Sequence, residues 1–130
     1  IDPIFGISCG FHCPDYPYLR ILGPHTGIDM PTHMGTPVRA GADGYVARAR
    51  DSGGSGYSYV LLLHGDDLST VYGHLSSIAV ETRAFVTRGS VLGATGGAPG
   101  TRGAGLSTGP HLHFEVRKDG ISVDPAGYLP

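Results

Sequence analysis

The side chains of this chain with the most chemical potential are four histidines and one aspartate in three short clusters. The clusters are His25-Thr-Gly-Ile-Asp29, Tyr72-Gly-His74 and His111-Leu-His113. Neutral imidazole nitrogen and carboxylate oxygen are zinc ligands, and a catalytic zinc commonly has three protein ligands and one open position. Together the clusters predict a zinc site with two groups left for acid and base chemistry.

The segment 110–118 alternates apolar and polar residues, which is typical of a strand with one buried and one exposed face. Successive residues on one face lie about 6 to 7 Å apart. His111 and His113 can therefore be two ligands, or one ligand and one base. Glu115 lies on the same face, either as a hydrogen-bond partner of one ring or as a solvent-side residue. The expected buried residues are Leu112, Phe114 and Val116.

His25 and Asp29 are separated by four positions, which on a straight strand would span roughly 13 Å. One ion cannot bind both across that distance, so the chain must bend between them. Gly27 permits unusual backbone angles at the bend, and Pro31 argues against a continuing helix. Taken alone, this pair is more simply interpreted as part of a surface turn.

Five motifs follow one another in the order found in lysostaphin/LytM-type zinc endopeptidases. They are His25-Thr-Gly-Ile-Asp29, Gly35-Thr-Pro-Val-Arg-Ala40, Asp43-Gly-Tyr-Val46, Tyr72-Gly-His74-Leu75 and Ser107-Thr-Gly-Pro-His111-Leu-His113-Phe-Glu-Val-Arg117. The resemblance extends from about residue 25 to residue 128 and closes with Val123-Asp-Pro-Ala-Gly-Tyr128. The chain thus resembles this family over about four-fifths of its length.

The resemblance implies that His25, Asp29 and His113 bind one zinc per chain, and that His74 and His111 are catalytic. In that mechanism zinc activates a water, and a neutral histidine takes the proton and passes it to the leaving amine. Which histidine is the primary base stays open. The chain has no His-Glu-x-x-His motif, so a helix-borne glutamate base is not expected.

The implied function is hydrolysis of amide bonds in peptidoglycan stem peptides or cross-bridges by a zinc endopeptidase. Glycyl-glycine bonds and bonds that contain D-amino acids remain equally open. A family member that binds cell wall or activates a partner amidase without catalysis is the alternative, but all five ligand and catalytic positions are intact. A zinc carrier or a structural zinc site would need no spare histidines.

Three further residues are candidates for supporting roles. His64 ends an apolar run and is interpreted as structural or as shaping the site, and Tyr72 could stabilise an oxyanion or simply pack in the core. Arg102 lies in a glycine-rich connection, 95–107, which is expected to form a mobile groove wall; it could bind a substrate carboxylate or be solvated. His12 and His33 are expected at the surface.

Two cysteines, Cys9 and Cys13, lie four positions apart in a glycine-containing segment. A disulfide there would close a tight loop and fit an oxidising, exported setting. A second metal site that uses His12 is a weaker interpretation, and two free thiols are the remaining one.

Short Val-, Leu- and Tyr-rich segments between glycine-containing turns predict an all-β fold. The expected strands are 36–40, 44–49, 57–64, 69–75, 90–93 and 111–118, with 78–86 left undecided between helical turn and strand. We expect residues 1–130 to form a single domain, an antiparallel β-sandwich with a substrate groove walled by loops. Residues 1–22 match the family least and form an extension.

A formal net charge of −2, from 9 basic and 11 acidic residues, gives no electrostatic argument for a nucleic-acid partner. No apolar run approaches the length of a membrane span. The chain begins at Ile1 without methionine, so we expect a processed protein or an excised domain whose export signal lies elsewhere. The expected location is extracytoplasmic, and a regulatory N-terminal region could lie outside this chain.

Overall fold

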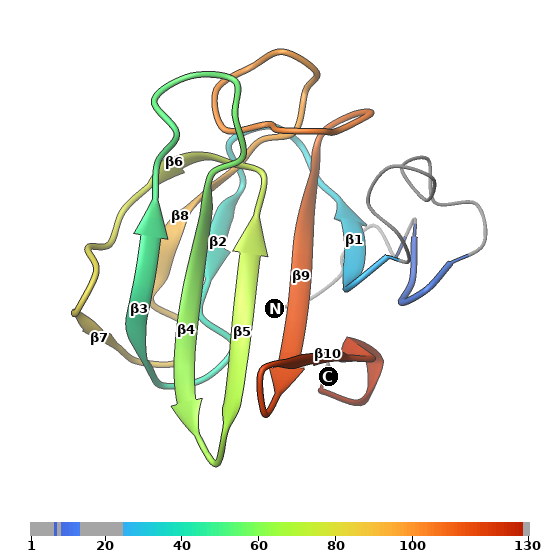
Figure 1. Cartoon of the computed structure of the whole chain (residues 1–130). Coiled ribbons are helices and arrows are strands. Elements are labelled where there is room, and N and C mark those ends of the chain that lie inside the picture. The colour runs from blue at the N-terminus through green and yellow to red at the C-terminus, as the bar shows by residue number, and fades with distance from the viewer. Residues whose placement is uncertain (1–6, 8, 14–24, 129–130) are drawn as a thin grey trace.

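The computed structural model describes residues 7, 9–13 and 25–128, and these residues form two antiparallel sheets (Figure 1). The larger sheet has the order β1 (Ile28–Pro31), β9 (His111–Lys118), β5 (Leu68–Gly73), β4 (Tyr59–Gly65), β3 (Gly44–Arg50) and β7 (Phe85–Val86). β10 (Ile121–Val123) also pairs with β9. The smaller sheet has the order β2 (Pro37–Arg39), β8 (Val91–Thr95) and β6 (Leu75–Ile78). The predicted all-β antiparallel architecture is confirmed.

The hydrophobic core lies where the two sheets face each other, and each sheet contributes one face to it. Phe114 on β9 pairs with Ile28 on β1 and with Tyr72 on β5, so that one row of apolar side chains crosses the larger sheet. Val38 and Leu92 on the smaller sheet belong to the same buried cluster. Directly paired residues share a face of a sheet, so the neighbouring row must point to the opposite face.

The predicted strand 69–75 is in fact two strands in different sheets. β5 ends at Gly73, β6 begins at Leu75, and His74 between them has a φ of 61°. This left-handed conformation is uncommon for a residue with a side chain, and it turns the chain from the larger sheet to the smaller one. The two-residue alternation expected across this segment therefore stops at His74.

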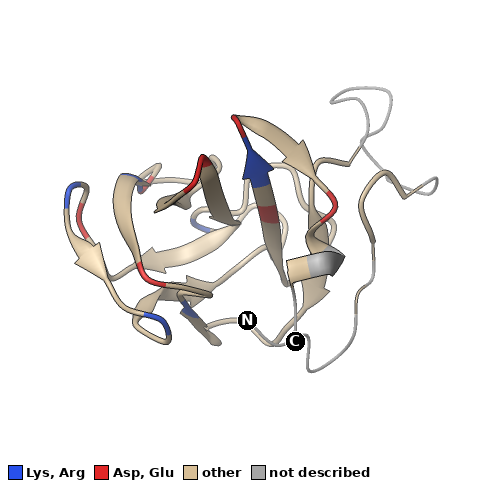
Figure 2. Ribbon diagram, turned by 90° about the horizontal axis from the view of Figure 1, so that it is seen from below, with Lys and Arg blue, Asp and Glu red and all other residues tan. Residues whose placement is uncertain are grey.

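The undecided segment 78–86 contains no helix. β6 ends at Ile78, a turn follows, and Phe85–Val86 form β7 at the edge of the larger sheet. The only described helix is the 3-10 turn η1 (Pro125–Tyr128), and no described helix is long and apolar enough to cross a membrane. Basic and acidic residues are interspersed along the described ribbon (Figure 2).

Candidate metal centre

Strand register brings the first two candidate ligands together. In the antiparallel pair of β1 and β9, Asp29 lies opposite His113, and on the other side of β9 Gly73 of β5 lies opposite the same histidine. These residues form the row next to the apolar row and so point away from the core. The short strand β1 was not predicted, because four residues ending in proline carry little local strand signal.

His25 reaches Asp29 because the chain bends directly before β1. The bend is at Gly27, but the reason for glycine differs from the predicted one: its φ is not in the left-handed region. Instead, a Cβ on Gly27 would lie 2.3 Å from the Phe114 carbonyl oxygen and 2.9 Å from Cγ of Glu115. Glycine is required here because the backbone passes close to β9.

The ligand atoms of the three residues lie at the spacing that zinc requires. His25 Nε2 is 3.2 Å from Asp29 Oδ1 and 3.2 Å from His113 Nδ1, and His113 Nδ1 is 2.9 Å from Asp29 Oδ1. Atoms bound tetrahedrally to one zinc at about 2.0 Å would be about 3.3 Å apart. The residues present therefore fit a zinc ion with small adjustments.

The other ring nitrogens explain why these three atoms converge. His25 Nδ1 lies 2.8 Å from the Gly10 carbonyl oxygen, and His113 Nε2 lies 2.8 Å from Oε1 of Glu115. When each of these nitrogens donates its hydrogen to its oxygen partner, His25 Nε2 and His113 Nδ1 present lone pairs. Together with the Asp29 carboxylate they then form a cluster of acceptors, which a cation can satisfy and a neutral core cannot.

Without a metal, a proton can take the position of the cation. Burial alone would lower the pKa of His113, but hydrogen bonds to Asp29 and Glu115 outweigh it and raise that pKa to about 9. Burial would raise the pKa of Glu115, but the hydrogen bond and the charge of His113 lower it to about 2. Burial would also raise the pKa of Asp29, but its hydrogen bonds with His113 and His25 outweigh burial and hold this pKa well below its ordinary value.

The polar face of β9 was expected to be exposed, and this expectation is wrong for His113 and Glu115, which are 7% and 6% exposed. The turn before β1 lies across them, and Thr26 donates a hydrogen bond of 2.8 Å to Glu115 Oε1. Arg117 adds an ion pair of 2.9 Å to Glu115 Oε2. Glu115 is thus held by three side chains and is in contact with His113 rather than with solvent.

His74 and His111 lie beside this cluster, and a backbone carbonyl holds each of them at Nδ1. Their ring centroids are 4.5 Å apart, and the His74 ring is 5.8 Å from that of His113. His74 Nδ1 hydrogen bonds the Ala104 carbonyl, and His111 Nδ1 hydrogen bonds the Gly109 carbonyl at 2.7 Å. Each ring therefore has Nε2 left for proton exchange, and His111 Nε2 is 3.5 Å from Asp29 Oδ1.

The environment of His74 favours the neutral imidazole. Burial and the nearby charge of His111 lower its pKa to about 4, although the Ala104 carbonyl partly opposes them. A histidine with this pKa is unprotonated at neutral pH and can accept a proton.

The glycine-rich connection before β9 supplies both carbonyl partners and is attached to a second loop. Gly103 N donates to the Gly54 carbonyl at 2.9 Å, and Ser58 N donates to the Gly103 carbonyl at 3.1 Å. Gly103 has a φ of 75°, and a Cβ there would lie 1.8 Å from the Leu75 carbonyl oxygen. This part of the connection is a hydrogen-bonded support for His74.

Three predicted supporting residues lie away from the cluster. Tyr72 is fully buried in the core, and its hydroxyl accepts a hydrogen bond from Gly41 N and contacts Thr70 Oγ1, both at 3.0 Å. Tyr72 and His74 do not share a face because the strand ends between them. His64 bonds the Asp43 carbonyl and Thr70 Oγ1, both at 2.7 Å, which fits its structural interpretation.

Arg102 is exposed and forms an ion pair of 2.9 Å with Asp51, so in this structure its guanidinium is engaged with an acidic loop residue. His12 and His33 are exposed. The extension 1–22 lies outside the described residues except for Ile7 and 9–13.

Three groups at the site were not predicted from the sequence. Tyr57 places its ring 5.0 Å from that of His74, and its hydroxyl occupies the space that a side chain on Gly73 would need. Thr26 and the Gly10 carbonyl hold Glu115 and His25. Thr26 lies within the His25–Asp29 motif but was given no role there, and Tyr57 and Gly10 belong to none of the five motifs.

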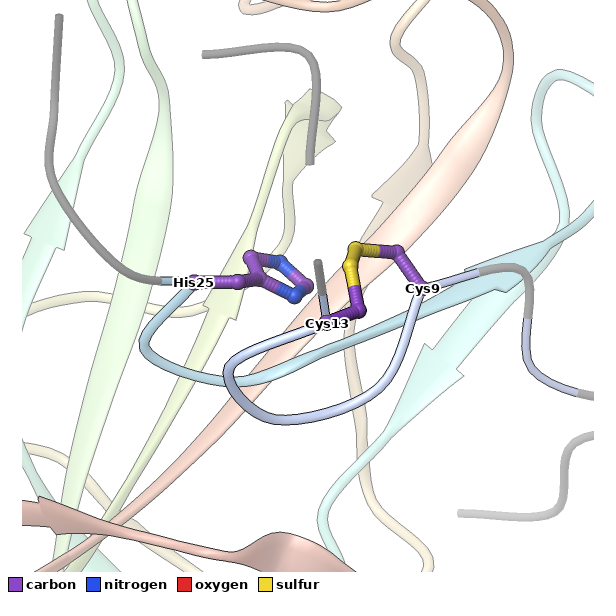
Figure 3. Close-up of side chains that lie close together, drawn as sticks. All are labelled: Cys9, Cys13 and His25. Atoms are coloured by element: carbon purple, nitrogen blue, oxygen red, sulfur yellow. A yellow bond between two sulfur atoms is a disulfide. The ribbon is translucent and has the colours of Figure 1, made fainter. Parts of the chain in front are cut away.

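Cys9 and Cys13 are joined by a disulfide, and their loop lies against His25 (Figure 3). A metal site formed by both cysteines and His12 is therefore incompatible with this structure.

Comparison with known proteins finds peptidases of similar sequence and fold. Peptidoglycan DD-endopeptidase ShyA of Vibrio cholerae is 38% identical over 109 residues, which are 84% of this chain and 24% of ShyA. A zinc-containing peptidase from Vibrio cholerae has a TM-score of 0.76 at 34% identity, covering 92% of this chain and 35% of that one. The catalytic domain of the antimicrobial peptidase lysostaphin from Staphylococcus simulans has a TM-score of 0.77 at 32% identity, covering 95% and 91%.

The chain spans about a quarter of the length of the curated relatives that it matches. The model of peptidase family M23 matches residues 23–125, which include both candidate ligand clusters and both flanking histidines. The chain therefore belongs to peptidase family M23.

Proposed function

We propose that this domain is a zinc-dependent endopeptidase that cleaves amide bonds in peptidoglycan peptides. The observation that carries the proposal is the convergence of three lone-pair atoms, from His25, Asp29 and His113, at zinc-ligand spacing beside two further histidines. A site that only stored or carried zinc would gain nothing from two histidines whose Nδ1 hydrogens are already fixed by backbone carbonyls.

Zinc held by these three residues would polarise the scissile carbonyl and lower the pKa of a water at its open position. His74, which is neutral at pH 7, accepts a proton at Nε2. His111 presents the same nitrogen from the other side of the ring pair, so one histidine can take a proton while the other delivers one to the leaving amine. Ala104 and Gly109 fix both rings through their carbonyls.

The substrate class is supported by the relatives and not by a binding pocket. ShyA is named a peptidoglycan DD-endopeptidase, which favours bonds between D-amino acids, and glycyl-glycine bonds stay the second class expected from the sequence. Peptidoglycan lies outside the cytoplasmic membrane, so we infer an extracytoplasmic location.

The test is digestion of two purified peptidoglycans, one with direct cross-links and one with glycine bridges. Zinc content is measured first, and the fragments are identified by mass spectrometry with and without a chelator. About one zinc per chain and chelator-sensitive cleavage of one substrate would support the proposal and name the bond. Zinc binding without cleavage of either substrate would refute the enzymatic function and favour a binding or activator module.

A further inference from the structure

The loop closed by Cys9 and Cys13 makes three hydrogen bonds, one to the His25 side chain and two between backbone groups, with the segment that carries two of the candidate ligands. The Gly10 carbonyl accepts from His25 Nδ1 at 2.8 Å, and the Cys9 carbonyl accepts from Asp29 N at 2.8 Å. His12 N donates to the His25 carbonyl at 3.0 Å. Figure 3 shows the His25 ring beside the disulfide of this loop.

Two of these bonds hold a candidate ligand in place. The Gly10 carbonyl selects the His25 tautomer whose Nε2 has a lone pair, and it sets the rotation of the ring. The Cys9 carbonyl extends the larger sheet by one bridge, opposite Asp29, on the side of β1 that β9 does not cover. Groups that orient metal ligands in this way commonly contribute a factor of 10 to 100 in metal affinity.

The disulfide determines whether these carbonyls can stay in place. It joins the residue before Gly10 to the residue after His12, and Cys13 N also donates to the Gly10 carbonyl at 3.2 Å. A five-residue loop without the covalent link has many more conformations, and only a few of them direct two carbonyls to His25 and Asp29.

We propose that the Cys9–Cys13 disulfide is a positioning element of the metal site, so that zinc affinity depends on the oxidation state of these two cysteines. The inference rests on the metal site proposed above. Reduction by a phosphine converts the disulfide and one water into two thiols and a phosphine oxide, and reoxidation by glutathione disulfide returns two glutathione thiols. A protein built in this way acquires its full zinc affinity only in an oxidising compartment.

The experiment compares zinc affinity, measured by competition with a chelator of known affinity, in three forms of the whole chain. These are the oxidised protein, the C9S/C13S double variant and the control Leu92→Ala, whose buried side chain belongs to the smaller sheet. We expect a 10- to 100-fold loss in the double variant and less than a twofold change in the control, although the control loses more thermal stability. Equal losses of zinc affinity in both variants would show that the disulfide acts only by stabilising the fold, which would overturn the proposal.

Two further readouts separate positioning from other effects. In zinc-loaded protein labelled with ¹⁵N, the His25 Nδ1 proton should be protected from exchange when the disulfide is present and exchange rapidly in C9S/C13S. Reoxidation should restore affinity in the reduced wild-type protein and not in the variant. Tighter zinc binding after reduction would show that the thiols bind zinc themselves, which would overturn the proposal, and absence of zinc from the oxidised protein would instead refute the metal site.

Discussion

Zinc binding should be strongly pH-dependent because a proton and the metal compete for His113. In the metal-free protein the pKa of His113 is raised to about 9 by its carboxylate partners. Its Nδ1 must lose that proton before it can bind zinc. The apparent affinity should therefore rise with pH until about pH 9 and then level off.

The size of the effect follows from the pKa. At pH 7 the group lies two units below its pKa, so the proton weakens zinc binding about 100-fold, or about 2.7 kcal/mol. Between pH 6 and pH 8 the affinity should increase about tenfold per unit. The sign for metal-free stability is opposite: the raised pKa stabilises the fold fully below about pH 6.5, and this contribution is lost as the pH rises through 9.

Titration calorimetry at pH 7.5 in buffers of different ionisation enthalpy counts the protons released by zinc. The matched control is Glu115→Gln, which keeps a hydrogen-bond acceptor for His113 Nε2 but removes one charge. We expect this variant to have a lower pKa at His113 and to release a smaller fraction of a proton at pH 7.5. Above about pH 9, where neither protein carries the competing proton, it should bind zinc 10- to 100-fold more weakly. Any proton released by a water at the zinc site would be counted equally in both proteins, so the difference in proton count reports on His113. An unchanged proton count in the variant, or an affinity independent of pH between 6 and 8, would refute the reasoning.

Three further predictions concern substitutions. His113→Ala should lose both metal and activity, whereas His111→Ala should keep most of the metal and lose turnover; equal zinc loss by metal analysis would contradict these roles. Gly27→Ala should destabilise the fold by about 1–3 kcal/mol in chemical denaturation and weaken zinc binding, because its Cβ would lie 2.3 Å from the Phe114 carbonyl oxygen; wild-type stability would show that this approach is not constrained. Tyr72→Phe should lose about 1–2 kcal/mol of stability and keep turnover per folded molecule. A loss of turnover without a loss of stability would show that this hydroxyl contributes to catalysis.

Local sequence patterns were sufficient for much of the fold. The alternation in 111–118 predicted β9 and its buried row, because a strand must separate its two faces. It could not show that the polar row is covered as well. That burial comes from Thr26 and the bend at Gly27, which are more than 80 positions away in the sequence. Contacts over such a distance leave no local periodicity.

The site was predictable in its residue types and less so in its supports. Five histidine and aspartate positions were identified by motif, and strand register explains how Asp29 and His113 meet. The carbonyls of Gly10, Ala104 and Gly109 that orient the rings are backbone atoms, and backbone acceptors have no sequence signature. The sequence left Tyr72 open between an oxyanion role and core packing, because no local pattern indicates the left-handed residue two positions later.

The backbone conformation of His74 is unfavourable for folding, yet it places the ring at the candidate site. His74 has a φ of 61° between two sheets, and glycine adopts this left-handed conformation at a lower conformational energy than histidine does. The ring is nevertheless buried, hydrogen bonds the Ala104 carbonyl and packs against Tyr57, so His74→Gly would relieve the backbone but lose these contacts. The residue to which we assign proton exchange thus occupies a backbone position that a fold without this chemistry would give to glycine.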